Sequence, residues 1–229
     1  METTGVTLVL GGTRSGKSEI AEAMAMSAAA ALDKPVLYVA TGPIPGAPSD
    51  VDYDEEWSRR VASHRSRRPA SWETLEISPG GSLAGALERT GSIVLIDSLG
   101  TWLAGVGDLG GETQSTRGPI GSFVSALEDR DVFDSPVIIV SEEVGLGVHP
   151  STQIGGRFRE ALGALNRAVS ERSSRAVLVV AGRTLELGPV FPPLPVSPPL
   201  PMSPSVTGEE DRWERSVDRD SRYDRDSRH

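Results

Sequence analysis

The sequence predicts an α/β protein in which a mostly parallel β-sheet is flanked by helices. Short runs rich in Val, Ile and Leu recur along the chain, as expected of strands that are covered on both faces. Stretches with helical character lie between these runs, and such alternation builds right-handed βαβ units. A glycine-rich segment follows the first apolar run directly. In open α/β sheets, ligands bind at the carboxyl ends of the strands, where such loops begin.

Five runs are predicted to be strands because each is nearly all apolar: Val6–Leu10, Val36–Ala40, Ile93–Asp97, Val137–Ser141 and Ala176–Ala181. The first predicted helix is rich in Ala and Met, three others are amphipathic, and the last is the longest: Ser18–Leu32, Glu55–Arg65, Ser82–Arg89, Ile120–Asp129 and Gln153–Ser173. Loops are expected at Gly42–Asp52, which is rich in proline, and at Gly105–Gly118, with a tight turn at Ser78–Gly81.

The composition changes after Gly188. Residues 189–204 contain eight prolines, and residues 207–229 contain eight acids and six arginines with few apolar groups. We therefore predict one folded domain over residues 1–188. Residues 189–229 are predicted to be a Pro-rich and then mixed-charge disordered tail. A Pro-rich ligand for a partner domain is the alternative interpretation of the first part of this tail.

Composition excludes several classes of function. The chain of 229 residues has no cysteine and three histidines, which excludes a disulfide scaffold and a thiolate metal site. The net charge is −9 and no run of basic residues marks a nucleic-acid patch, which argues against a nucleic-acid partner. No apolar run reaches the roughly 18–20 residues that a membrane span needs. Because the first residues lack the basic region of a signal peptide, we expect a cytoplasmic protein.

The glycine-rich segment carries the strongest indication of function. Gly11–Ser18 (GGTRSGKS) fits the pattern G-x-x-x-x-G-K-[ST], between a predicted strand and a predicted helix. Glycines let backbone N–H groups point at phosphate oxygens, and the following helix N-terminus adds positive potential. In such a phosphate-binding loop, Lys17 reaches the β and γ phosphates and the Ser18 hydroxyl binds Mg²⁺. The alternative is a turn that matches by accident. The loop predicts nucleotide binding and leaves the reaction open.

Acidic residues at two predicted strand ends are candidates for holding the metal ion. Asp97 follows the apolar residues 93–96, a pattern in which the carboxylate helps to bind Mg²⁺. Glu142 and Glu143 follow the strand at 137–141 and are rival candidates, unless they belong to a solvated strand end.

His64 lies in a basic segment. Five arginines lie within six residues of it: Arg59, Arg60, Arg65, Arg67 and Arg68. Nearby cations disfavour the imidazolium, so His64 is predicted to be neutral and nucleophilic, and the arginines could bind phosphates. From this segment alone, an incidental histidine on a basic surface helix is the favoured interpretation. His149 is predicted to lie in a loop and His229 in the tail.

Together, these blocks resemble the bifunctional adenosylcobinamide kinase / adenosylcobinamide-phosphate guanylyltransferase family of cobalamin biosynthesis. The resemblance covers residues 6–183, and its blocks are GGTRSGKS at 11–18, VLYVAT at 36–41, DEEWSRRV with His64, Arg68-Pro69 and Trp72 at 54–72, DSLGTWL at 97–103, SEEVGLGVHP at 141–150, and Arg157-Phe158-Arg159 with Leu165-Asn166.

The resemblance implies two reactions. In the first, a nucleoside triphosphate phosphorylates the aminopropanol hydroxyl of adenosylcobinamide. In the second, GTP forms a GMP–histidine intermediate and the GMP passes to adenosylcobinamide phosphate, giving adenosylcobinamide-GDP. By motif position the guanylylated histidine is His64, which reverses the interpretation from its segment alone. Lys17 is implied as the second catalytic residue.

The resemblance also implies the binding residues. Mg²⁺ is expected on Ser18 and Asp97, GTP is the guanylyl donor, and GTP or ATP serves the kinase step. The corrinoid is the partner substrate, and a homotrimer with a RecA-like P-loop sheet is expected. The implied nucleotide-binding residues are Gly11, Gly12, Thr13, Arg14, Ser15, Gly16, Lys17, Ser18, Ala40, Thr41, Gly42, Arg65, Ser66, Arg67, Arg68, Glu76 and Asp97.

The chain departs from the pattern of this family at a few positions. Ser98 stands where the family usually has Cys, Glu142 where it has Asn, and Trp57 where it has Met, and the loop at 42–52 is longer. Two other functions stay open from the sequence. A single-activity P-loop kinase would bind nucleotide without forming an adduct on His64, and a non-catalytic module would bind GTP without turnover.

Overall fold

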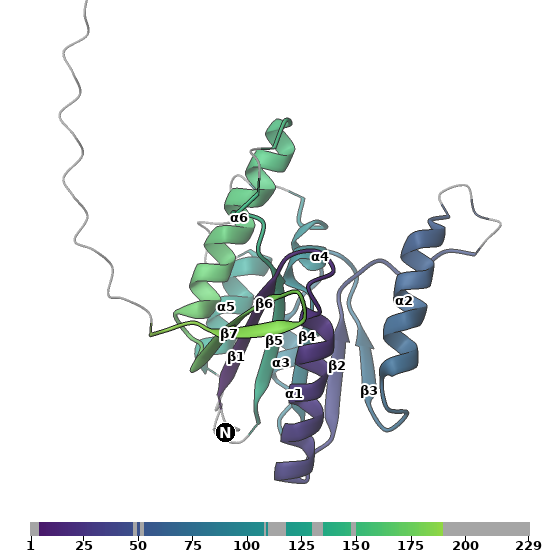
Figure 1. Cartoon of the computed structure of the whole chain (residues 1–229), viewed down its shortest axis with the longest axis vertical. Coiled ribbons are helices and arrows are strands. Elements are labelled where there is room, and N and C mark those ends of the chain that lie inside the picture. Colours follow the sequence, from purple (N-terminus) through teal and green to yellow (C-terminus); the bar gives the residue numbers. More distant parts are fainter. Residues whose placement is uncertain are drawn as a thin grey trace, which may run out of the picture. The chain divides into compact units, whose positions relative to one another are not determined.

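A computed structural model describes residues 5–47, 50, 53–107, 109, 118–129, 135–147 and 150–189. In this part of the chain, seven strands form one sheet in the order β3-β2-β4-β5-β1-β6-β7, with helices on both faces (Figure 1). Every pairing is parallel except that of β6 with β7. The predicted α/β fold with a mostly parallel sheet is confirmed. His149, His229 and all of the predicted tail beyond Pro189 lie outside the described residues.

The five predicted strands are present with small shifts of their ends. The strands are β1 (Val6–Gly11), β2 (Val36–Ala40), β3 (Glu73–Glu76), β4 (Ile93–Asp97), β5 (Val137–Glu142), β6 (Arg175–Val180) and β7 (Arg183–Glu186). The helices are α1 (Lys17–Leu32), α2 (Glu55–Arg67), α3 (Ala84–Leu87), α4 (Leu99–Leu103), α5 (Pro119–Asp129) and α6 (Gln153–Ser170). Among the described helices, none has the length and apolar character to cross a membrane.

Two predicted helices were too long. The helix predicted at Ser82–Arg89 is the single turn α3, and the one predicted to reach Ser173 ends at Ser170. Beyond α6 the Ser173 hydroxyl donates to the carbonyl of Val169 at 2.8 Å, and the Arg172 guanidinium donates to that of Ala168 at 2.8 Å. These side chains satisfy the last carbonyls of the helix, so the chain can turn into β6.

The central strands are buried on both faces. In β4, Val94 and Ile96 belong to the core under α3, α4, α5 and α6, whereas Ile93 and Leu95 belong to the core under α1. Successive side chains of a strand point to opposite faces, so a strand between two helical layers must be apolar at every position. This geometry explains the continuous apolar runs of the sequence.

Helix α1 lies close against the sheet because its inner face carries small side chains. Ala21, Ala25 and Ala28 are buried against residues of β1, β2, β4 and β5. Their spacing of four and three residues places them on one side of the helix. This packing fixes the start of α1, and with it Lys17 and Ser18, over the carboxyl ends of the central strands.

Three elements were not predicted: β3, α4 and β7. Strands β3 and β7 lie at the two edges of the sheet, and most of their residues are exposed, so they lack an apolar run. Helix α4 has only five residues. Its capping box, in which Ser98 and Thr101 bond to each other's backbone N–H, was the pattern that could have revealed it.

The strand order brings three functional candidates to one edge of the sheet. Strand β5 lies between β1, which leads into the phosphate-binding loop, and β4, which ends at Asp97. In the register of β1 and β5, Gly11 pairs with Glu142, the last residue of β5. The loop, Asp97 and Glu142 therefore meet at neighbouring carboxyl ends, where open α/β sheets bind their ligands.

The packing of α6 predicts a large cost for Leu162→Ala. Leu162 is fully buried, and deletion of such a side chain leaves a cavity, so the free energy of unfolding should fall by about 2–5 kcal/mol in a urea titration. Leu146→Ala is the matched control, because Leu146 is 84% exposed and its loss should change stability by less than about 0.5 kcal/mol. Equal losses in the two variants would contradict this packing.

Candidate active site

The phosphate-binding loop has the geometry of an anion cradle. Arg14 and Gly16 have positive φ angles of 57° and 93°, and the loop leads into the first turn of α1. Such a backbone turns successive N–H groups toward one point. The hydroxyl of Ser15 is buried and has no hydrogen-bond partner among the described residues. A phosphate oxygen would supply the partner that this buried group lacks.

Lys17 is held inside the loop by an acid. Its side chain is only 5% exposed, and its Nζ lies 3.3 Å from Oε1 of Glu142. A buried ammonium needs such a partner, because desolvation of an unpaired charge is costly. An anionic ligand in the loop would therefore compete with Glu142 for Lys17.

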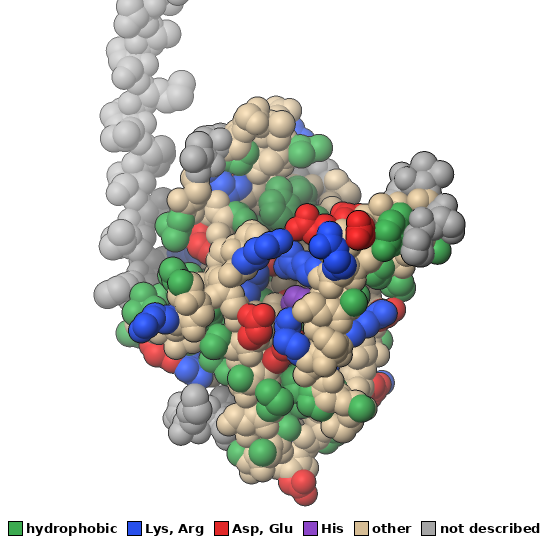
Figure 2. Space-filling view, turned by 45° about the vertical axis from the view of Figure 1, so that its right-hand side comes forward, with side chains coloured by type: hydrophobic (Ala, Val, Ile, Leu, Met, Phe, Trp, Pro, Cys, Tyr) green, Lys and Arg blue, Asp and Glu red, His purple; other side chains and the backbone are tan. Residues whose placement is uncertain are grey.

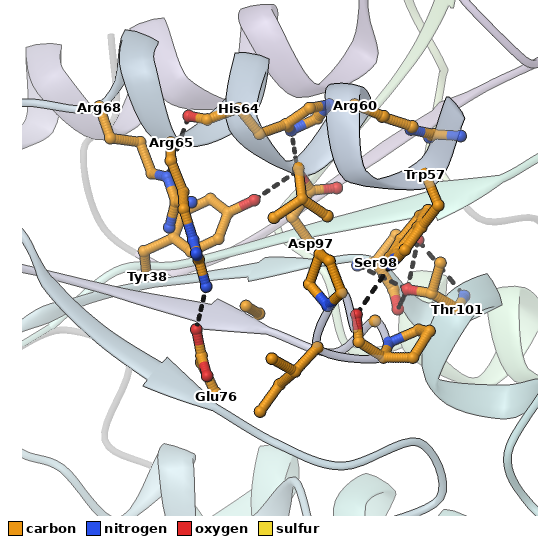
Figure 3. Close-up of a pocket in the computed structure, with 16 residues that line it drawn as sticks. Tyr38, Trp57, Arg60, His64, Arg65, Arg68, Glu76, Asp97, Ser98 and Thr101 are labelled. Atoms are coloured by element: carbon orange, nitrogen blue, oxygen red, sulfur yellow. Dashed lines mark hydrogen bonds and ion pairs between the residues drawn. The ribbon is translucent and has the colours of Figure 1, made fainter. Parts of the chain in front are cut away.

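Three donors surround the carboxylate of Asp97. The Ser18 hydroxyl donates to Oδ1 at 3.2 Å. The Tyr38 hydroxyl donates to Oδ2 at 2.8 Å, and His64 Nδ1 lies 3.5 Å from Oδ2 (Figure 3). Burial of Asp97 opposes its charge, but the interactions with His64, Tyr38 and Ser18 outweigh this and lower the pKa of Asp97 below its usual value. Asp97 is therefore an anion that faces the Ser18 hydroxyl. Two such oxygens suit Mg²⁺, which prefers oxygen ligands.

The pKa of the neighbouring Tyr38 phenol is shifted in the opposite direction. Burial, followed by the negative charge of Asp97, raises the pKa of Tyr38 far above its usual value. Tyr38 therefore stays protonated, and its hydroxyl donates a hydrogen bond to Asp97. The Arg68 guanidinium lies over the other side of this phenol, 3.9 Å from the centre of the ring.

Helix α2 brings His64 to this carboxylate, although none of its residues is buried. The helix begins after Asp54, whose side chain accepts a hydrogen bond from the Trp57 N–H at 2.9 Å. Side-chain pairs then attach it to the rest of the domain. Arg67 donates to both oxygens of Glu22 on α1 at 3.1 and 3.2 Å, and Arg65 donates to Glu76 on β3 at 2.6 Å.

These pairs change the interpretation of the basic segment. The sequence suggested that cations surround the imidazole of His64, whereas the structure also places the Asp97 carboxylate beside this ring, 3.5 Å from Nδ1. Arg65 and Arg67 are turned toward acids of other elements. Contacts between residues far apart in the chain, which the local sequence does not contain, cause this difference.

Two hollows meet at His64. A groove of about 600 Å³ runs along the phosphate-binding loop, and a narrower cleft of about 70 Å³ lies between β2, α2 and the loop after β2. His64 and Arg60 line both of them. Figure 2 shows basic side chains gathered around the histidine on this face. The imidazole is thus placed to contact ligands in both hollows.

The residues implied for nucleotide binding divide among these hollows. The groove is lined by Thr13, Arg14, Ser15, Gly16, Lys17, Ser18 and Arg67. The cleft is lined by Ala40, Gly42, Arg65, Arg68, Glu76 and Asp97. The residues that line neither are Gly11, Gly12, Thr41 and Ser66. Thr41 is fully buried, and its hydroxyl bonds to Ser98 and Thr101, so its side chain holds the loop after β4 in place.

Sequence reasoning did not place Tyr38 and Glu22 in the site. Tyr38 is the polar interruption of an otherwise apolar strand, and this was the available indication of its role. Glu22 follows Ser18 by one helical turn, so both lie on the same face of α1. Carboxylate or imidazole atoms of Glu22, His64 and Asp97 lie within 4.8 Å of one another.

Comparison with known proteins shows a family whose model matches most of the chain. The model of the cobinamide kinase / cobinamide phosphate guanyltransferase family matches residues 7–187. The chain is 35% identical over 182 residues to the bifunctional adenosylcobalamin biosynthesis protein CobP of Pseudomonas aeruginosa, with 79% of this chain and 95% of the relative covered. It is 29% identical over 185 residues to the bifunctional protein CobU of Salmonella typhimurium, with 76% and 95% covered.

Tyr38→Phe tests the protonation of the buried phenol. Since the pKa of Tyr38 is raised in the folded protein, this phenol keeps its proton at about pH 10, where an ordinary tyrosine ionises. Ultraviolet titration of folded wild type and folded Tyr38→Phe should therefore count the same number of ionising phenols. The unfolded wild type should show one more than the unfolded variant. Wild type should also lose stability relative to the variant as the pH rises above about 10, because the unfolded chain releases this proton first.

Titration of one phenol fewer in folded Tyr38→Phe than in folded wild type would contradict the contact with Asp97. Tyr53→Phe is the control, since Tyr53 is another described tyrosine and has no part in the contacts of Asp97.

Proposed function

The chain belongs to the cobinamide kinase / cobinamide phosphate guanyltransferase family, and we propose that it is a bifunctional enzyme that carries out both reactions in late cobalamin biosynthesis. It phosphorylates adenosylcobinamide with a nucleoside triphosphate. It then transfers GMP from GTP to adenosylcobinamide phosphate through a GMP–histidine intermediate. The observation that carries this proposal is the position of His64, on the common wall of the phosphate groove and the cleft, with Nδ1 facing Asp97.

The phosphate-binding loop serves the kinase reaction. The oxygen of the acceptor hydroxyl attacks the γ-phosphorus, the bond to the β–γ bridging oxygen breaks, and the nucleoside diphosphate leaves with the electron pair. Lys17 and the N–H groups of the loop stabilise the charge that spreads over the phosphate oxygens. The buried Ser15 hydroxyl, which lacks a partner among the described residues, supports a phosphate in this position.

His64 serves the guanylyl transfer. A proton kept on Nδ1, beside Asp97, leaves the lone pair of Nε2 free for attack on the α-phosphorus of GTP. Pyrophosphate leaves, and Asp97 stabilises the positive charge of the ring in the adduct. An oxygen of adenosylcobinamide phosphate then attacks the phosphorus, the P–N bond breaks, and neutral imidazole is restored. Arg59, Arg60 and Arg67 line the groove, where their positive charge would attract the triphosphate.

The structure also offers candidate residues for binding Mg²⁺ and the guanine ring of GTP. Ser18 and Asp97 are the residues that would hold Mg²⁺. A bound Mg²⁺ would neutralise part of the negative charge on the phosphates. In the cleft, the Glu76 carboxylate would accept hydrogen bonds from N1–H and the 2-amino group of guanine, which adenine lacks. Guanine would then replace Arg65 as the partner of Glu76. The homotrimer implied by the family resemblance and the cytoplasmic location expected from the N-terminal sequence stay predictions.

A covalent adduct on His64 is the decisive prediction. Wild-type protein incubated with Mg²⁺ and GTP labelled at the α-phosphate should carry label after denaturation, because the P–N bond survives base and is broken by acid. GTP labelled at the γ-phosphate should leave no label, since this phosphate departs in pyrophosphate. His64→Ala should lose the adduct completely and still phosphorylate adenosylcobinamide, because the histidine takes no part in the kinase step.

Each rival function predicts a different result. A single-activity kinase would phosphorylate a small molecule and give no adduct from either label. A non-catalytic module would bind GTP with neither reaction. Absence of the adduct from wild-type protein that binds GTP would reject the guanylyl transfer proposed here.

Lys17→Ala should slow phosphorylation of adenosylcobinamide by about 10²–10³-fold, the usual cost of removing one donor that stabilises transition-state charge. The assay follows transfer of the γ-phosphate to the corrinoid. The chain has one other lysine, Lys34, whose Nζ lies 3.5 Å from the Ser135 hydroxyl near the amino ends of the strands. Lys34→Ala is the matched control and should keep the wild-type rate. An equal loss of rate in this control would show that the loss of a positive charge or of folded protein caused the effect, and not the loss of a phosphate contact.

A further inference from the structure

Ser98 and Glu142 contact each other across two neighbouring strand ends, although they are 44 residues apart in the chain. The Ser98 hydroxyl donates to Oε1 of Glu142 at 2.9 Å and lies 3.1 Å from Oε2. A hydrogen bond to an ionised acceptor is stronger than one between neutral groups. The two side chains form one structural unit.

The fold provides a defined place for this carboxylate. Oε2 of Glu142 accepts the backbone N–H of Gly100 at 3.0 Å. A Cβ on Gly100 would collide with the same oxygen, so the close approach requires glycine at this position. Glu142 ends β5, beside the first residue of the phosphate-binding loop, and its side chain is 18% exposed. The carboxylate is therefore oriented by its neighbours and lies at the centre of the catalytic edge of the sheet.

Three donors contact the carboxylate of Glu142. An ionised carboxylate has about four acceptor sites. Ser98 reaches both oxygens, Gly100 bonds to Oε2, and Lys17 Nζ lies 3.3 Å from Oε1. A triphosphate in the loop draws Lys17 to its β and γ phosphates. Oε1 then has a free lone pair beside the loop that binds these phosphates, at the moment when the nucleotide is bound.

We propose that Glu142 accepts the proton of the acceptor hydroxyl during phosphoryl transfer; this inference rests on the kinase activity of the proposed function. The hydroxyl proton passes to Oε1, the oxygen attacks the γ-phosphorus, and the nucleoside diphosphate leaves with the electron pair of the broken bond. Asp97, the acid that ends β4, is engaged differently, because Ser18, Tyr38 and His64 contact its two oxygens. Glu142 is thus a base for the kinase reaction alone and takes no part in guanylylation of His64.

The test compares Glu142→Gln with wild type in three measurements. Glutamine keeps an oxygen acceptor for Gly100 and an amide in contact with Ser98, but it cannot take up a proton. The kcat for phosphorylation of adenosylcobinamide should fall by about 10²-fold or more, the usual contribution of a general base. Labelling of His64 by GTP carrying label at the α-phosphate should keep the wild-type rate. Affinity for a non-hydrolysable triphosphate, measured by calorimetry, should be equal or higher, because Lys17 loses a competing anion.

Glu160→Gln is the control. Glu160 is an exposed residue of α6 and lines neither the groove nor the cleft. This variant should keep the wild-type kcat, because it removes one negative charge without removing the base.

The remaining outcomes would overturn the inference in distinguishable ways. An unchanged kcat in Glu142→Gln, with tighter triphosphate binding, would make Glu142 only the counter-ion of Lys17. Equal losses of phosphorylation and of His64 labelling would make its role structural. Wild-type protein that labels His64 but does not phosphorylate adenosylcobinamide would overturn the kinase part of the proposed function, and this role with it.

Discussion

The buried carboxylate of Asp97 holds the parts of this site together. A carboxylate removed from water needs donors in place of its hydration, and here they come from three elements. Ser18 belongs to the first turn of α1, Tyr38 to β2, and His64 to α2. Because α2 buries none of its own residues, its position depends on such polar contacts rather than on an apolar face. One acid at the end of β4 thus sets the distance between the phosphate-binding loop and the histidine.

The central fold could be predicted because its physical causes are local. Strands between two helical layers must be apolar at each position, so β1, β2, β4, β5 and β6 stand out in the sequence. The edge strands β3 and β7 bury little surface and have no such pattern. Their pairing is decided by the neighbours that the finished sheet offers, which a reading of ETLE or RTLE alone cannot supply.

The same distinction applies to the site. The loop at residues 11–18 could be recognised because its glycines, lysine and serine act within eight consecutive residues, and Asp97 because it ends an apolar run. The surroundings of His64 could not be recognised in the sequence. Glu22, Glu76 and Asp97 come from three other elements and pair with α2 only in the folded chain. The contact between Ser98 and Glu142 is likewise a product of neighbouring strand ends. Ser98 and Glu142 look unrelated in the sequence, and in the fold they form a contact that holds a charge beside Lys17.

The turn between β6 and β7 has a consequence for the order in which this enzyme matures. Ala181 and Gly182 both have positive φ angles, and the N–H of Gly182 donates to the carbonyl of Ser15 at 2.8 Å. A segment near residue 182 therefore supports the shape of a loop near residue 15. During synthesis on the ribosome, the loop near residue 15 emerges first. The hydrogen bond from Gly182 can form only after almost the whole domain has been synthesised. Capture of nucleotide by a nascent chain would thus report that the last strands of the sheet have joined it.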